Sequence, residues 1–149
     1  MSAYTIGNLP RITRTDLAGL IRSKKPGVTV IDVRDSDFVG GHIIGCKNVP
    51  VHTHDYRMPE LVRDLRDQDV VVFHCALSQQ RGPASALRYL RERDRMDDKG
   101  EIGVRKDGES LSEAQKVYVL DGGFVKWQEV YGEDTELTEG YVKDLWDGY

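Results

Sequence analysis

The sequence predicts an α/β domain with a central, mostly parallel sheet of five strands and helices on both of its faces. Short apolar runs alternate along the chain with segments of helical periodicity, an order typical of parallel sheets. The two clearest runs, "VTVIDV" and "VVVFHC", are β-branched and continuously apolar, as strands are when both sheet faces are covered. At 149 residues the chain fits one domain over 1–149.

Five short segments are expected to form the strands, and crossovers between parallel neighbours are expected to be right-handed. The segments are residues 11–12, 28–33, 47–51, 70–74 and 117–120.

Four helices are expected between these strands. The first follows Thr13, whose spacing to Asp16 resembles a capping box. The second covers "MPELVRDLRD", and the third begins with Pro83 at its first position. The fourth covers "FVKWQEVY" and ends at Gly132.

Two segments fall outside this alternation. Residues 96–115 are polar, contain three glycines and lack periodicity, so we expect a mobile surface loop there. The acidic tail ends in "YVKDLWDGY", and its aromatic residues predict that it packs back on the domain.

Composition excludes several classes of protein. The net charge of −4, with basic residues scattered among acidic ones, argues against a nucleic-acid partner, and no apolar run is long enough to span a membrane. The N-terminus has no readable signal peptide, and two cysteines make no disulfide framework. We therefore expect a cytoplasmic or nuclear protein with reduced thiols. No metal site is expected, because no ligand set accompanies "HTHD".

The stretch "HCALSQQRGP" carries the candidate chemistry. Cys75 follows an apolar strand, at the carboxyl end where α/β sheets bind ligands. Five residues separate it from Arg81, and a loop of this length can turn its backbone N–H groups inward to hold an anion. The helix N-terminus and Arg81 add positive charge suited to a tetrahedral oxyanion. The expected oxyanion-binding residues are Ala76, Leu77, Ser78, Gln79, Gln80 and Arg81.

The same groups favour the thiolate of Cys75 over the thiol, so the sequence predicts attack by sulfur on a bound oxyanion. An isolated cysteine at a strand end is otherwise most often a small core residue. His74 has two readings: a hydrogen-bond donor that tunes the thiolate, or a buried residue that holds the loop. The Ser78 hydroxyl is a further candidate donor to the sulfur.

These residues resemble a known family. His-Cys-x5-Arg resembles the signature of cysteine-dependent phosphatases, and the following Gly-Pro is similar to the M-phase inducer phosphatases and related eukaryotic arsenate reductases, both of rhodanese fold. Two further stretches, "VIDVRDSDFVGGHIIGCKNVP" and "VYVLDGGFVKW", resemble rhodanese patterns in the expected order. The resemblance covers residues 30–127 and implies a single rhodanese-like domain.

The resemblance implies a tyrosine-phosphatase-like enzyme that hydrolyses phosphate monoesters through a phosphocysteine, with no cofactor. Its substrate would be a phosphorylated protein or a small aryl phosphate. The alternative is an arsenate reductase that uses glutathione and a glutaredoxin partner. Thiosulfate sulfur transfer is less expected, since sulfurtransferases typically have a loop one residue shorter. A non-catalytic module that binds a phosphorylated partner is the remaining alternative.

Two departures bear on these alternatives. The M-phase inducer phosphatases have a glutamate at the position of Gln80, and an amide cannot donate a carboxyl proton to a leaving oxygen. This favours phenol esters or arsenate as substrate. Their resolving cysteine corresponds to Val33 here, so Cys46 is expected to be a buried structural thiol.

Overall fold

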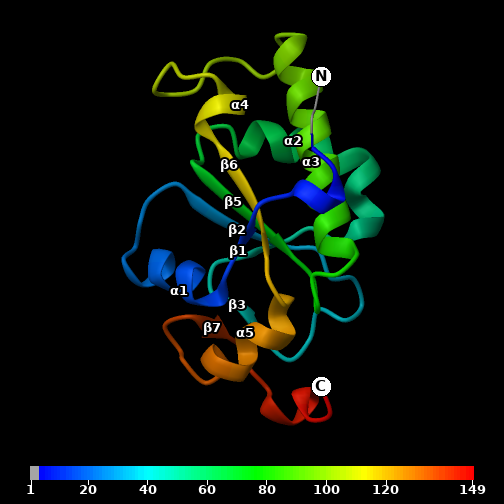
Figure 1. Cartoon of the computed structure of the whole chain (residues 1–149), viewed down its shortest axis with the longest axis vertical. Coiled ribbons are helices and arrows are strands. Elements are labelled where there is room, and N and C mark those ends of the chain that lie inside the picture. Colours follow the sequence, from blue (N-terminus) through cyan, green and yellow to red (C-terminus); the bar gives the residue numbers. More distant parts are fainter. Residues whose placement is uncertain (1–3) are drawn as a thin grey trace.

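A five-stranded parallel sheet with the strand order β1-β6-β5-β2-β4 forms the centre of the computed structural model, which describes residues 4–149 (Figure 1). This confirms the predicted fold class. The strands are β1 (Arg11–Ile12), β2 (Val28–Asp32), β4 (Lys47–Asn48), β5 (Val70–His74) and β6 (Lys116–Leu120).

Side chains of the central strand β5 alternate between two hydrophobic cores. Val71 and Phe73 belong to a core that includes side chains of two helices, whereas Val72 belongs to a second core on the other face. The first core is built with α2 (His54–Asp64) and α3 (Arg81–Asp98), the second with α1 (Arg14–Arg22) and α5 (Gly123–Tyr131). Coverage of both faces explains why the strand sequences are continuously apolar.

A two-stranded antiparallel sheet, which the sequence did not predict, joins β3 (His42–Ile43) to β7 (Thr138–Glu139). Strands of two residues are too short to show periodicity, so they escape sequence analysis. This sheet brings the chain after α5 beside the segment that follows β2. The short 3-10 helices are η1 (Ile6–Asn8), η2 (Val51–Thr53) and η3 (Lys143–Trp146).

Helix boundaries differ from expectation at one functionally important point. The third helix begins at Arg81, two positions before Pro83. The loop that follows β5 is therefore shorter, and Arg81 stands on the first turn of α3. The N-cap hydrogen bond between the Thr13 hydroxyl and the Asp16 amide is present as predicted, at 3.1 Å. Within residues 4–149, none of the helices is long and apolar enough to cross a membrane.

The segment over residues 96–115 is more structured than a surface loop. It starts in the last turn of α3 and ends in α4 (Leu111–Ala114), and the side chains of Ile102 and Leu111 are buried. Arg105 is also buried, and its guanidinium donates to the carbonyls of Arg66 at 3.0 Å and Gln68 at 2.9 Å. A few buried side chains and hydrogen bonds hold this segment, and because they do not recur at a regular spacing, the sequence shows no periodicity there.

A buried ion pair lies directly beyond β2. The side chains of Asp32 and Arg34 are fully buried, and their shortest contact joins Nη2 to Oδ2 at 2.8 Å. Arg34 also donates to the Gly41 carbonyl at 2.9 Å and lies against the rings of Phe38, Phe124 and Trp146. Burial raises the pKa of Asp32, but His74 and Arg34 outweigh it and hold the pKa below its ordinary value. Arg34 thus fastens residues 35–41 to the sheet.

Replacing Arg34 tests this pair. We expect Arg34→Met to lower the free energy of unfolding at pH 7 by about 3–5 kcal/mol, because it removes the guanidinium that neutralises the buried Asp32 carboxylate and leaves that carboxylate only the main-chain N–H of residue 34 as a hydrogen-bond donor. Since the folded pKa of Asp32 is lowered, the stability that this carboxylate contributes to wild type is fully present above about pH 4 and is lost as pH falls through the lowered pKa, so the difference from wild type should narrow in that range. Urea unfolding at several pH values measures both effects.

Arg22→Met is the matched control, because the Arg22 ion pair with Asp134 is exposed. It should cost less than about 1 kcal/mol. If both variants lose the same free energy of unfolding, the buried Asp32–Arg34 pair stabilises the protein no more than the surface pair does.

Candidate active site

Cys75 follows β5 directly, and its sulfur lies at the N-terminus of α3. The side chain is buried, and Sγ accepts hydrogen bonds from the N–H groups of Ser78 at 3.2 Å and Gly82 at 3.3 Å. The Gly82 N–H is one of the first N–H groups of the helix, which have no partner within the helix itself. The positive end of α3 is therefore directed at the sulfur, an arrangement that favours negative charge on it.

The first two carbonyls of the loop point away from the sulfur, towards α5. The Cys75 carbonyl accepts from the Phe124 N–H at 3.0 Å, and the Ala76 carbonyl accepts from the Val125 N–H at 2.9 Å. In a trans peptide the C=O and N–H groups point in opposite directions. The N–H groups of Ala76 and Leu77 consequently point away from α5.

Glycine at position 123 permits this close approach of α5. Its φ is 58°, and a Cβ added there would lie 2.4 Å from the Ala76 carbonyl oxygen and 2.6 Å from that of Cys75. Any side chain would push the loop off the helix. The Gly-Gly pair belongs to the rhodanese-like stretch "VYVLDGGFVKW". The sequence alone does not predict that Gly123 contacts the cysteine loop.

Ser78 takes a backbone conformation that is unusual for a residue with a side chain, at φ 55°. This turn aims its N–H at Sγ, and its hydroxyl lies 3.4 Å from the Cys75 N–H as an acceptor. The main-chain N–H of Ser78 thus donates to the sulfur. Within residues 4–149, the Ser78 hydroxyl makes no hydrogen bond to the sulfur, although the sequence predicted one. Local strain of this kind is typical of functional loops.

His74 supports the loop through a hydrogen bond with the Cys75 carbonyl. Its ring is fully buried, and Nδ1 lies 3.0 Å from the Cys75 carbonyl oxygen, so Nδ1 carries the proton. Burial lowers the pKa of His74 against the opposing effects of Asp32 and of that hydrogen bond, so the ring is neutral at pH 7. Its Nε2 has no hydrogen-bond partner within residues 4–149, and lies 3.7 Å from Asp32 Oδ2. Of the two readings of His74, the geometry supports the one in which it holds the loop.

Arg81 is paired with a carboxylate that the sequence did not single out. Its two terminal nitrogens lie 2.9 and 2.6 Å from the two oxygens of Asp37. This hydrogen-bonded contact with Arg81 lowers the pKa of Asp37, and the pKa of Arg81 is raised by the same contact. A guanidinium has five N–H groups, so three remain for an oxyanion after the pairing.

Together these residues form a cup of about 340 Å³. It is lined by Cys75, Ala76, Leu77, Gln79, Gln80 and Arg81. Of the predicted oxyanion-binding residues, only Ser78 is absent from this lining, because it is buried beneath the sulfur. The arrangement brings the cysteine, the main chain of the loop and a guanidinium together around one small volume, which is suited to a tetrahedral oxyanion.

Other titratable groups lie outside the cup. Cys46 is half-buried and unpaired as a thiol within the described chain, and burial raises its pKa to about 12, so it stays protonated. Asp55 is exposed and pairs with Arg88 on the surface. Across residues 4–149, no three His, Cys, Asp or Glu side chains are placed to hold a metal ion.

Gly123→Ala tests the contact between α5 and the loop. We expect a loss of about 2–4 kcal/mol in the free energy of unfolding, because the added methyl meets two carbonyl oxygens at a positive φ. The rate at which iodoacetamide alkylates Cys75 at pH 7 should also differ between the variant and wild type, because the added methyl displaces the loop that holds the sulfur.

Gly19→Ala on α1 is the control, because a Cβ there meets no atom within 4 Å. Helix propensity predicts that it stabilises the protein by up to about 1 kcal/mol. Wild-type stability and alkylation rate in Gly123→Ala would contradict the proposed contact.

Comparison with known proteins places the chain in a family. Residues 13–130 match the Rhodanese-like domain family. The chain is 35% identical to the CDC25-like phosphatase YCH1 of Saccharomyces cerevisiae, over 98% of this chain and 99% of that protein. It is 30% identical to Arsenate reductase 2.2 of Oryza sativa, over 78% of this chain and 80% of that protein.

A solved structure agrees in fold. The crystal structure of Saccharomyces cerevisiae Ygr203w, described as a homolog of single-domain rhodanese and Cdc25 phosphatase catalytic domain, matches with a TM-score of 0.73 and 32% identity. The match covers 99% of this chain and 98% of that one. These findings confirm the resemblance inferred from the three sequence motifs: the chain belongs to the rhodanese-like domain family.

Proposed function

We propose that this protein is a phosphatase that hydrolyses phosphate monoesters with Cys75 as its nucleophile. The observation that carries the proposal is the position of Sγ, which receives two main-chain N–H groups and belongs to a residue that lines one cup together with Arg81. Its similarity to a CDC25-like phosphatase over nearly its whole length supports the same activity.

The reaction has two steps. The Cys75 thiolate attacks phosphorus in line with the ester oxygen; the S–P bond forms as the P–O ester bond breaks, and the alcohol leaves with a proton taken from water. A second water then attacks the phosphocysteine, which releases inorganic phosphate and regenerates the thiolate. In both steps the N–H groups of the loop and the guanidinium of Arg81 would bind the three non-bridging oxygens.

Proton donation to the leaving group shapes the choice of substrate. Gln80 lines the cup but carries an amide, and the nearby Asp37 is held ionised by Arg81. A phenolate leaves without a strong acid because its conjugate acid is far more acidic than an alkyl alcohol. We therefore propose aryl phosphates, including phosphotyrosine in proteins, as the substrate class.

Arsenate reduction is the second candidate, favoured by Gln80 and by the similarity to a rice arsenate reductase. Arsenate has the size and charge of phosphate and has no ester group to expel. The cup would bind arsenate, and Cys75 would attack arsenic with loss of an oxygen as water. Two glutathione thiols, delivered with a glutaredoxin, would then supply two electrons: their sulfurs join as glutathione disulfide, the bond between arsenic and the Cys75 sulfur breaks, and arsenite leaves with the Cys75 thiolate regenerated.

Cys75→Ser separates these activities from background. We expect wild type to release phosphate from p-nitrophenyl phosphate and Cys75→Ser to lose at least about 10³-fold in kcat, because the alcohol is a poor nucleophile at neutral pH. Rapid acid quenching of wild type should trap a phosphorylated cysteine, detected by mass spectrometry. Wild type as inactive as the variant, with arsenate loss driven by glutathione and glutaredoxin, would establish the second candidate instead.

Asp37→Asn tests the role of the Arg81 partner. We expect KM for p-nitrophenyl phosphate to rise about tenfold with a smaller change in kcat, because the guanidinium loses the carboxylate that orients it. Since the pKa of Asp37 is lowered, this carboxylate stays charged in wild type down to about pH 4, so its effect should persist throughout the assay range.

Asp35→Asn is the matched control, because Asp35 lies on the same turn but pairs with His52. It should leave KM within about twofold of wild type. A rise in KM of equal size in both variants would mean that the turn, and not the Arg81 contact, matters.

A further inference from the structure

We propose that the hollow beside the cup binds the aromatic ring of the substrate. This inference deepens the proposed phosphatase function by assigning the site that selects aryl esters. The hollow has a volume of about 130 Å³ and is lined by Asp37, Val39, Ala76, Leu145, Trp146 and Tyr149. We call it the ring slot.

The ring slot adjoins the oxyanion cup. Ala76 lines both, and Asp37 lines the slot while pairing with Arg81 at the rim of the cup. A group attached to an oxyanion in the cup therefore has an adjoining hollow to enter. The slot holds one carboxylate, that of Asp37, which is paired with Arg81, and its other five lining residues are apolar or aromatic.

The chemistry of its walls fits a flat apolar group. Val39, Leu145 and Tyr149 are 57%, 52% and 70% exposed, which is high for large apolar side chains. A ring placed between them would remove apolar surface from water on both partners. The volume suits this occupant, since an engineered cavity of about 150 Å³ lined by apolar side chains binds benzene.

The slot has fixed walls, although its two sides come from distant parts of the chain. The indole nitrogen of Trp146 donates to the Gly40 carbonyl at 2.8 Å, and the Val142 N–H donates to the same carbonyl at 3.1 Å. Trp146 also packs on Phe124 and on the ring of Tyr149. A site that is already formed loses less free energy on ordering when it binds a ligand.

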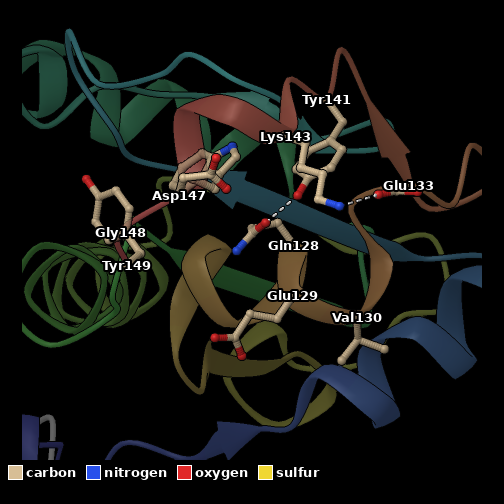
Figure 2. A pocket seen from close by; sticks show the side chains of 10 residues that line it. Gln128, Glu129, Val130, Glu133, Tyr141, Lys143, Asp147, Gly148 and Tyr149 are labelled. Carbon is tan, nitrogen blue, oxygen red and sulfur yellow. Dashed lines mark hydrogen bonds and ion pairs between the residues drawn. The ribbon is translucent and has the colours of Figure 1, made fainter.

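Beyond the ring slot, the surface continues into a larger groove of about 510 Å³. Trp146 and Tyr149 line both. Figure 2 shows Tyr149 at one side of this groove, apart from the hydrogen bond of Gln128 with Tyr141 and the ion pair of Lys143 with Glu133. The groove leaves room for whatever is attached to the far end of the ring, as a polypeptide is in phosphotyrosine.

The test uses ligands that bind without reacting, because an aryl ester also differs from an alkyl ester in its leaving group. Benzylphosphonate and ethylphosphonate share the oxyanion and differ in the ring. Each is titrated as a protectant of Cys75 against iodoacetamide, with the modified peptide quantified by mass spectrometry. In wild type we expect half-protection at about tenfold lower concentration for benzylphosphonate.

Tyr149→Ala and Leu145→Ala should reduce this preference to about twofold or less, since each removes one wall of the slot. The matched controls are Tyr56→Ala and Val104→Ala, which remove side chains that are 70% and 76% exposed and line neither the cup nor the slot. The controls should keep the wild-type preference, and urea unfolding checks that all four variants are folded.

Three outcomes would overturn the ring slot: equal protection by both phosphonates in wild type, no protection by either, or an unchanged preference in both slot variants. Failure of the proposed function has a different signature. If wild type hydrolyses no aryl phosphate yet still prefers benzylphosphonate, the slot stands and the phosphatase assignment falls.

Discussion

The geometry of the site depends on one set of contacts, the hydrogen bonds from the first turn of α5 to the carbonyls of Cys75 and Ala76. These bonds direct the carbonyl oxygens at α5 and thereby turn the following N–H groups away from α5. Because a trans peptide unit is planar, its C=O and N–H groups point in opposite directions. When the carbonyl oxygens lie on one face of the loop, the N–H groups of the same peptide units lie on the other. The anion site is thus a consequence of where α5 begins, and Gly123 is the residue that lets α5 begin there.

A second constraint links this loop to the rest of the molecule through buried charge. Asp32 and Arg34 are paired in the interior beside His74, whose ring holds the Cys75 carbonyl. Arg34 also holds the turn that carries Asp37, which in turn orients Arg81. Two strand ends, one turn and one helix start are therefore positioned relative to each other by groups that cannot move without leaving a charge unpaired in the interior.

The sequence predicted well what is contiguous. The apolar run of β5, the cysteine and the loop follow one another along the chain, so their order and proximity could be inferred from spacing, while the roles proposed for them stay predictions. Contacts across the fold could not. Asp37 lies 44 positions before Arg81, and nothing in "DSDF" distinguishes it from the neighbouring Asp35. The strands β3 and β7 have two residues each. The start of α3 at Arg81 is accompanied by a hydrogen bond from the Gly82 N–H to Sγ, a contact that no local propensity encodes.

The sides of the ring slot come from segments of the chain more than a hundred positions apart, which meet at Gly40 and Trp146. The reacting groups, by contrast, stand on the strand and helix at the centre of the domain. Evolution can therefore exchange Val39, Leu145 or Tyr149 without touching the nucleophile. Related proteins that share one reaction centre could diverge in what they accept by altering these few surface positions, so that chemistry is inherited while selectivity is free to drift.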